Sequence, residues 1–384
     1  VYFQGRYEIA VEYLERAALL PPAPDPDETL CREVACFSGH VLAFQNGQQV
    51  CRGGYPPHQF AGALGHLADT LPVRQHLNRL AGDTSLANLN LACWQDGACL
   101  YVPAQQRLEL PLFAFYGVTE ADAMLHPRTL AVLERGAEAV LVEHYLGQGR
   151  QHYWQNAVTE ILLGVDARLT HIRVLEEGAT ATHTGLTAVR LERNSEYRAL
   201  HLGMGGALAR HDLRVMLAGP DSAIRIDAFD LADGRRHTDL HLQVDHDAPR
   251  TSSRISYRGM AQGRGRAIFN GHVRVDRNAH QTDAGQSCRG LLLSPHAEVD
   301  AMPWLEIYAD DVKCGHAASV GNLDPNALFY LQSRGIAAAE ARQLLLQGFA
   351  NEALSLLDEV QLRDWFMPRL HLALSRQAGQ EETA

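Results

Sequence analysis

The sequence predicts a mainly β chain whose central part is a parallel β-helix, with a mixed α/β region before it and a helical domain after it. Between residues 89 and 321, short segments rich in Leu, Val and Ile are separated by Gly, Asp and Asn, which is typical of strands joined by turns. Turn-like segments recur there with centres at residues 138, 167, 196 and 223. A period of this length without intervening helices is typical of a solenoid. A β-sandwich remains the alternative, because regular strand spacing also suits that fold.

The region before the repeats, residues 6–88, is expected to form a mixed helical domain. Residues 1–5 look like the remnant of a protease-cleavable tag and are set aside. A helical pattern over residues 7–20 is followed by a proline-rich acidic linker at residues 21–27, which neither helix nor sheet continues through. Residues 39–48 then predict a strand running into a turn, and residues 60–80 have helical spacing interrupted at Pro72.

The region after the repeats, residues 322–384, is expected to be helical. Asp324 is a capping residue, Pro325 suits a first helical turn, and Gly335 marks a helix end. Apolar residues then follow a helical period over residues 337–350, 352–357 and 364–374.

Composition excludes several classes of protein. The 384 residues are 46% hydrophobic and carry a formal net charge of −11, which argues against nucleic acid as a main partner. No apolar run long enough to span a membrane and no signal peptide is visible, so we expect a cytoplasmic protein with no membrane partner. The 7 cysteines form no Cys-x-x-Cys pair, which suits mostly isolated, reduced thiols.

The segment Cys314-Gly315-His316 carries the strongest chemical signal. In an extended strand, residues two apart share one face, so the thiol and the imidazole point the same way. Both groups are ligands for iron, zinc or copper, and two of them make half of a four-coordinate site. The other half has to come from elsewhere.

Four segments, in this order, resemble the SufB/SufD family of iron–sulfur cluster assembly scaffolds, and within it the SufD branch: residues 265–271, 297–300, 306–316 and 329–336. The resemblance implies a right-handed parallel β-helix. It also implies a heterodimer with SufB, docking of the ATPase SufC on the C-terminal helical domain, and a transient iron–sulfur cluster shared with SufB. The family's usual N-terminal Arg-Lys-x-Glu-x-Trp-Lys-Tyr-Thr signature is missing between Arg6 and Leu30.

The resemblance also implies site residues. His316 takes the position of the family's interface histidine, with Cys314 as a second candidate ligand. Cys288 stands where SufB carries its interface cysteine and SufD chains tend to have Asn, which suggests a third ligand or a SufB-like homodimeric scaffold. For SufC docking the implied candidates are Phe329, Tyr330, Arg334, Leu345 and Phe349. The chain has no nucleotide-binding loop, since Gly203-Met204-Gly205-Gly206 lacks the lysine and helix of a phosphate site, so ATPase activity is expected only in SufC.

Structural roles compete with these assignments. His316 can pack in a strand with its nitrogens satisfied, and Cys288 can be a small buried thiol. A second possible metal site, His237-Asp239-His241, is more simply a solvated strand face. A β-helix can also be a polysaccharide-active enzyme with paired carboxylates such as Asp227, Asp230 and Asp233, although the cytosolic character argues against it. A solenoid that binds only protein is distinguished by holding no metal.

Overall fold

The computed structural model describes residues 39–53, 61–82, 84–147, 149–354, 356–357 and 362–378 of the chain. The tag remnant, the helix predicted over residues 7–20, the linker at 21–27 and part of the segment 352–357 lie outside these ranges. Among the described helices, none is long and apolar enough to cross a membrane.

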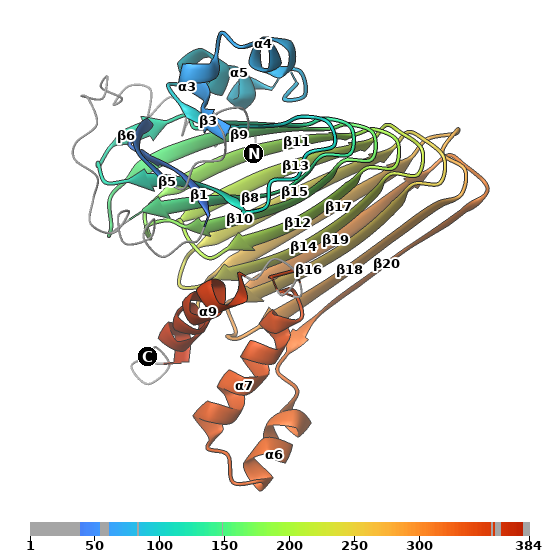
Figure 1. Ribbon diagram of the computed structural model, residues 1–384. Helices are drawn as coiled ribbons and strands as arrows, with labels where there is room; N and C mark the ends of the chain where they lie inside the picture. Colours follow the sequence, from blue (N-terminus) through green and yellow to red (C-terminus); the bar gives the residue numbers. More distant parts are fainter. Residues whose placement is uncertain are drawn as a thin grey trace.

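Two long sheets face each other along the molecule (Figure 1). One, sheet A, contains in spatial order β2 (Gln48–Gly53), β1 (His40–Gln45), β5 (Leu112–Val118), β8 (Glu138–Gly147), β10 (Arg168–Glu176), β12 (Glu196–Gly203), β14 (Ala223–Ala232), β16 (Ser252–Ala261), β18 (Thr282–Leu292) and β20 (Val312–Asn322). The other, sheet B, contains β19 (Glu298–Ile307), β17 (Arg266–Val275), β15 (His237–His246), β13 (Leu208–Leu217), β11 (Thr182–Leu191), β9 (Tyr153–Leu163), β7 (Arg128–Leu133), β4 (Gly97–Val102) and β3 (Ala61–Ala63), with β6 (Ala123–Leu125) beside β9.

The chain alternates between the two sheets and advances by one strand per turn. From β8 onward even-numbered strands belong to sheet A and odd-numbered strands to sheet B, and each pairs in parallel with the strand two numbers away. Parallel pairing of this kind confirms the β-helix and is incompatible with a β-sandwich, whose sheets are antiparallel. Antiparallel pairs occur among the described strands where the solenoid begins, between β1 and β2 and between β3 and β4.

The predicted repeat marks one corner of the solenoid. Glu138, Arg168, Glu196, Ala223 and Ser252 lie side by side in register at the start of successive strands of sheet A. The preceding corner repeatedly uses the left-handed backbone region, at Gly136, Asp166, Asn194, Asp221, Arg250 and Gln281. Gly, Asn and Asp adopt that conformation most readily, which explains the turn residues seen in the sequence.

Both faces of sheet A are buried at β12. The Leu-rich sequence of this strand predicts that Leu200 and Leu202 line the interior, but this is wrong, because both face outward under the C-terminal helices and His201 between them faces the lumen. The lumen itself is filled by aliphatic side chains and stacked aromatic rings such as Tyr257 on Phe269, with ring centroids 4.5 Å apart. When both faces of a strand are apolar, the alternation of its residues does not tell which face points inside.

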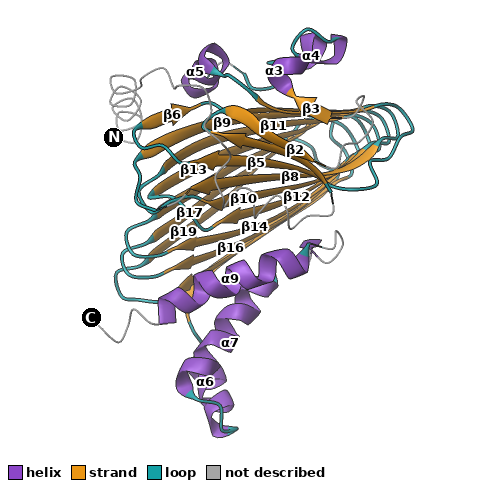
Figure 2. Cartoon of the chain, turned by 60° about the vertical axis from the view of Figure 1, so that its left-hand side comes forward, coloured by secondary structure: helices purple, strands orange, loops and turns teal. Residues whose placement is uncertain are grey.

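The C-terminal helices α6 (Pro325–Ser333), α7 (Ala338–Asn351) and α9 (Arg363–Ala378) confirm the predicted pattern. Asp324 caps α6 by accepting a hydrogen bond from the Asn326 backbone N–H at 2.9 Å, and Gly335 has φ +88°. Helix α9 lies along the outer face of sheet A, whereas α6 extends away from the solenoid (Figures 1 and 2).

The N-terminal helices α3 (Leu64–Leu67), α4 (Leu71–His76) and α5 (Ser85–Cys93) lie against sheet B. Pro72 occupies the first turn of α4, after a break that separates this helix from α3, so the expected interruption falls between two helices. The expected strand and turn at residues 39–48 are β1 and the start of β2, and they already belong to sheet A. The boundary predicted between residues 88 and 89 falls inside α5.

Candidate functional site at the open end of the solenoid

The last turn of the β-helix leaves two strand edges open. Among the described strands, β20 is hydrogen-bonded to β18 on one side only, and β19 likewise ends sheet B. Residues 315–321 of β20 are all exposed. An open edge of this length presents unpaired backbone donors and acceptors to a partner.

Cys314 and His316 lie in the row of β20 that continues the lumen. Their register partners on β18 are the buried residues Ala284 and Gln286, so both side chains fall on the inward side of sheet A, as the strand alternation predicts. Cys314 packs partly against the lumen core, and burial raises the pKa of its thiol although the Ala284 backbone opposes this. His316 is exposed because no further turn covers it.

Gln286 on β18, the register partner of His316, links sheet A to the open strand of sheet B. Its side chain is 3% exposed and its amide nitrogen donates to the backbone carbonyl of Trp304 on β19 at 3.4 Å. The two sheets are therefore joined at the level of the imidazole.

Cys288 lies one turn deeper. Its side chain is 1% exposed, its register partner is Ala318, and burial raises the pKa of the thiol to about 12. With strands about 4.8 Å apart and residues two apart separated by about 6.6 Å, the diagonal from Cys288 to His316 is about 8 Å between Cα atoms. That span is compatible with two ligands of one cluster, but the neutral, buried thiol of Cys288 requires the end of the solenoid to open first.

The donor set at this end is incomplete. In the part of the chain that the structure describes, no group of three or more His, Cys, Asp or Glu side chains is arranged to hold a metal ion. Cys314 and His316 are the two soft ligands exposed or half-exposed at the open end. Two ligands leave half of a tetrahedral site to be supplied by another molecule.

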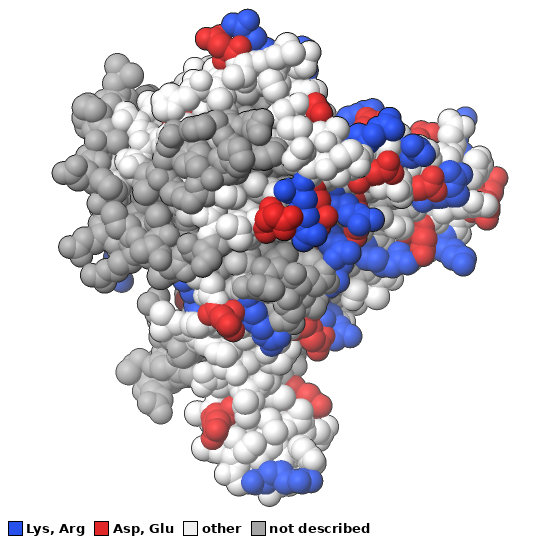
Figure 3. All heavy atoms as spheres, viewed as in Figure 1, with Lys and Arg blue, Asp and Glu red and all other residues white. Residues whose placement is uncertain are grey.

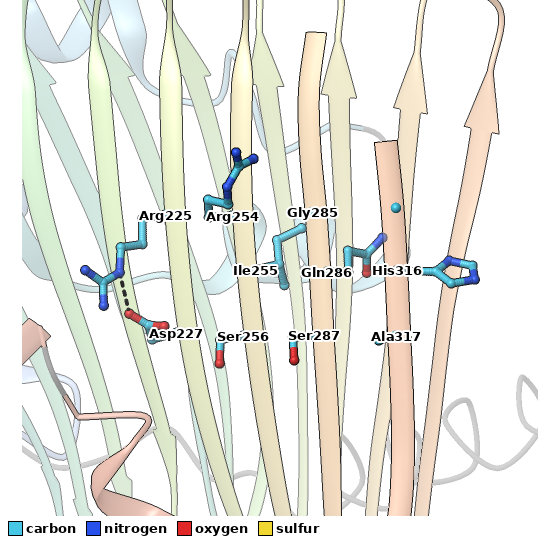
Figure 4. Close-up of a pocket in the computed structure, with 11 residues that line it drawn as sticks. Arg225, Asp227, Arg254, Ile255, Ser256, Gly285, Gln286, Ser287, His316 and Ala317 are labelled. Atoms are coloured by element: carbon cyan, nitrogen blue, oxygen red, sulfur yellow. Dashed lines mark hydrogen bonds and ion pairs between the residues drawn. The ribbon is translucent and has the colours of Figure 1, made fainter. Parts of the chain in front are cut away.

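An open groove of about 530 Å³ lies behind these residues on the outer face of sheet A (Figure 4). Small residues at Gly285, Ser287, Gly315 and Ala317 form its floor, and the Arg225–Asp227 pair borders it. In Figure 4 the His316 ring points away from the hydroxyls of Ser256 and Ser287. His316 itself is among the residues that line this groove, so the groove reaches the open end of the solenoid.

The side chains around Asp239 form a closed ion-pair cluster. Arg210 Nη1 lies 2.6 Å from Asp239 Oδ2, and its guanidinium also contacts both nitrogens of His241 at 2.7 and 2.8 Å. Asp239 is 4% exposed, so the expectation of a solvated face is wrong at this residue. An arginine occupies the position between the donors that a metal ion would need.

The carboxylates considered for glycoside chemistry do not converge. Asp227 faces outward and pairs with Arg225 at 2.9 Å, Asp230 faces the lumen, and Asp233 pairs with Arg236 at 2.8 Å in a turn. Paired carboxylates facing one substrate are the requirement for that chemistry. These three side chains therefore give no support to the enzyme interpretation.

Helix α6 carries the most exposed aromatic residues of the C-terminal domain. Phe329 is 71% and Tyr330 is 56% exposed, and the Arg334 guanidinium lies 4.9 Å from the Tyr330 ring centre. Leu345 on α7 is half-buried, whereas Phe349 packs toward the solenoid beneath Arg258, 5.4 Å from its ring centre. Helix α6 has no buried residue, so its two aromatic rings are largely exposed to water, with Arg334 over the face of Tyr330.

Sequence reasoning missed the apolar surface of β19. Met302 and Trp304 are 53% and 60% exposed on the outer side of this open strand, and the Trp304 ring stacks on His272 with centroids 4.7 Å apart. Large apolar residues flanking Pro303 in a terminal strand were the available signal. Elsewhere on the visible face, acidic and basic side chains interleave with no extended patch of one sign (Figure 3).

The sequence matches the SUF system FeS cluster assembly SufBD core domain over residues 115–349. It is 36% identical to the chloroplastic protein ABCI7 of Arabidopsis thaliana over 278 residues, which cover 70% of this chain and 58% of that protein. It is 32% identical to the iron-sulfur cluster assembly protein SufD of Escherichia coli over 245 residues, covering 64% of this chain and 58% of that protein. A SufBD family protein of Synechocystis matches at 32% identity over 291 residues, covering 73% of this chain and 64% of that protein. The chain thus spans about three fifths of the length of these curated relatives.

Proposed function

The chain belongs to the SufBD family of SUF-system iron–sulfur cluster assembly proteins, and we propose that it is a SufD-type scaffold subunit that assembles a nascent cluster together with SufB. The cluster is the cargo of this assembly, held only transiently. The chain itself binds no nucleotide, and its ATPase partner is SufC. The observation that carries the proposal is the open end of the solenoid, where two soft ligands lie beside unpaired strand edges.

SufB pairs with this chain across β20 and β19. The exposed apolar side chains there, Val320, Met302 and Trp304, lose their contact with water in such a complex. His316 then faces the partner and supplies an imidazole ligand, with Cys314 beside it as the second donor. SufB completes the donor set.

SufC docks on the α6–α7 hairpin. Phe329 and Tyr330 are aromatic anchors of the kind that dominate binding energy at interfaces, and Arg334 stiffens this surface by lying over Tyr330. Because α6 extends away from the β-helix (Figure 2), a partner bound there leaves the open end free for SufB. Leu345 contributes at the edge of this surface, and Phe349 supports it from below.

The test is anaerobic assembly of this chain with the SufB and SufC of its source, followed by iron and sulfide quantification. His316→Ala is expected to leave the complex intact and to weaken iron retention about tenfold or more, the usual cost of disturbing a ligand environment. His296→Ala, at an exposed turn between β18 and β19, is the matched control and keeps iron retention unchanged. A complex with unchanged iron and sulfide in His316→Ala refutes the site, and the absence of any complex refutes the scaffold role.

Cys288 distinguishes this role from that of a SufB-like homodimeric scaffold. Such a scaffold needs a soft ligand from each copy, and Cys288 is buried behind Ala318. Cys288→Ser is therefore expected to leave the iron and sulfide content of the complex unchanged. A loss of iron in this variant makes Cys288 a cluster ligand, either as a third donor beside SufB or in the homodimeric alternative.

A further inference from the structure

Ionisable side chains gather inside the β-helix, far from its open end. They come from six neighbouring strands and one corner, and all are buried: Glu143, Tyr145, His171, Arg173, Glu177, His183, Tyr197, His201, His211 and Asp230. A solenoid lumen is normally filled by apolar side chains. Charged groups are retained in such a place only when they are paired and hydrogen-bonded.

Most of these groups have partners. His171 bridges Glu143 and Tyr197, with both contacts at 2.9 Å. Arg173 lies between His183 and His201, and His183 Nδ1 is 2.9 Å from Glu177 Oε2.

Three polar atoms on the other side of Arg173 have no partner. These are His211 Nδ1, Asp230 Oδ2 and the Thr238 hydroxyl, each buried. All three side chains line one small enclosed cavity of about 10 Å³, which His201 also lines. A cavity of this size, counted for the centre of a water-sized probe, is about the minimum for one water molecule.

The backbone is shaped around this cluster. A Cβ atom at Gly203 would lie 2.1 Å from Asp230 Oδ1, and one at Gly185 would lie 2.7 Å from both Arg173 Nη2 and His211 Nδ1. Both glycines have ordinary backbone angles, since neither appears among the residues with positive φ. Glycine is therefore needed at both positions because a side chain there would occupy the space of the polar groups.

Charged groups surround the cavity. Arg173 carries a fixed positive charge that acts on Glu143, His201 and His211 within the lumen. His201 Nε2 lies 3.5 Å from Asp230 Oδ1, and the His201 and His211 rings stack with centroids 5.3 Å apart. Burial lowers the pKa of both imidazoles, Arg173 lowers them further, and Asp230 opposes this at His201. The Tyr257 hydroxyl from β16 also interacts with the Asp230 carboxylate, and Arg210 and Asp239 are further charged residues that line the cavity.

We propose that this cavity binds one water molecule and that the water joins Asp230, His211 and Thr238 into one buried hydrogen-bonded site beside His201. The water donates to Asp230 Oδ2 and to His211 Nδ1 and accepts from the Thr238 hydroxyl. Arg173 keeps its charge throughout and separates this site from the Glu177–His183 pair.

The test compares the full-length wild type with Asp230→Asn and Thr238→Val. A high-resolution crystal structure of the wild type is expected to show a water within hydrogen-bond distance of Asp230 Oδ2 and His211 Nδ1. In Asp230→Asn, histidine-labelled NMR titration should show the protonation constant of His201 falling about tenfold or more, because the carboxylate that stabilises the imidazolium is lost. Asp227→Asn, on the outer face of the same strand, is the matched control and leaves that titration unchanged.

Thr238→Val keeps the side-chain volume and removes one water partner, so it tests the site if Asp230→Asn does not fold. It is expected to lose the water and to shift the His211 titration while the fold is retained. A dry cavity in the wild type overturns the water site. A His201 titration that is the same in Asp230→Asn and wild type, or a His211 titration that is the same in Thr238→Val and wild type, overturns the coupling of the water site to these imidazoles.

Discussion

Replacing Glu160 with Gln tests what holds the N-terminal helices on the solenoid. Glu160 lies on the outer side of β9, and its side chain is fully buried. The carboxylate accepts hydrogen bonds from the backbone N–H groups of Asn78 and Leu80, each at 2.7 Å, and of Ala81 at 3.2 Å. It also pairs with the buried guanidinium of Arg128 at 2.8 Å. One side chain thus fixes the segment between α4 and α5.

The expected cost follows from this geometry. Gln keeps the shape of Glu160 but removes the charge that compensates Arg128, and its amide NH₂ faces donors where an oxygen accepted before. Removing one member of a buried ion pair costs about 3–5 kcal/mol, so Glu160→Gln should lower the free energy of unfolding by about that amount. Adding Arg128→Met should recover part of the loss, because the uncompensated charge is then gone.

Urea denaturation followed by circular dichroism measures this change, and hydrogen exchange at residues 78–81 locates it. Glu138→Gln is the matched control, because Glu138 on β8 is 44% exposed and lies 3.8 Å from Arg107. A surface pair of this kind contributes at most about 1 kcal/mol. If Glu160→Gln lowers the free energy of unfolding no more than the control does and leaves hydrogen exchange at residues 78–81 unchanged, the Glu160 carboxylate does not hold the helices on the solenoid.

Three further expectations concern pH, thiol reactivity and partner binding. Burial lowers the pKa of His246 from 6.5 to about 4, so its contribution to stability is full above pH 6.5 and is lost as pH falls toward 4. The unfolding free energy measured by urea titration should drop by about 1.4 kcal/mol at pH 5.5 for such a histidine, and an unchanged value refutes neutral burial. Iodoacetamide at pH 8 should alkylate Cys314 long before Cys288, whose pKa of about 12 leaves almost no thiolate; equal rates in peptide mapping of the folded protein would contradict this. Phe329→Ala should change the free energy of unfolding by less than about 0.5 kcal/mol and weaken SufC binding about tenfold. Leu71→Ala, at a residue 67% exposed on α4, is the control and should leave SufC binding unchanged in the same titration.

The coil of the chain was predictable because each corner needs residues that tolerate the left-handed region. Asp166, Asn194 and Asp221 recur at these corners, and their spacing is the length of one turn. The helix at residues 325–333 was predictable for a similar local reason, since Asp324 and Pro325 fix its start. Local backbone chemistry is readable in sequence because it does not depend on distant residues.

The orientation of the strands was not predictable in the same way. In β12 both Leu200 and His201 are buried, one under the C-terminal helices and the other in the lumen. The sequence shows which residues of a strand face inward only when the other face of that strand is in water. The buried polar site is therefore hidden in a sequence where His171, Arg173 and His201 look like the polar face of an amphipathic strand. The sequence did predict that Cys314 and His316 share one face of their strand, because residues two apart in any strand point the same way.

The two ends of the solenoid differ in a way that bears on its partners. At the first turn β2 and β3 pair antiparallel with β1 and β4 and so end the coil. At the last turn no described strand caps β20 in this way, although β20 is 11 residues long and carries one charged residue, Lys313. Natural proteins protect edges of this length with charges, bulges or covering elements, and solenoids need capping units at both ends. An uncapped edge that also carries Val320 beside the exposed His316 is best explained if another chain forms the cap. The same contact that completes the ligand set then also stabilises the end of the fold.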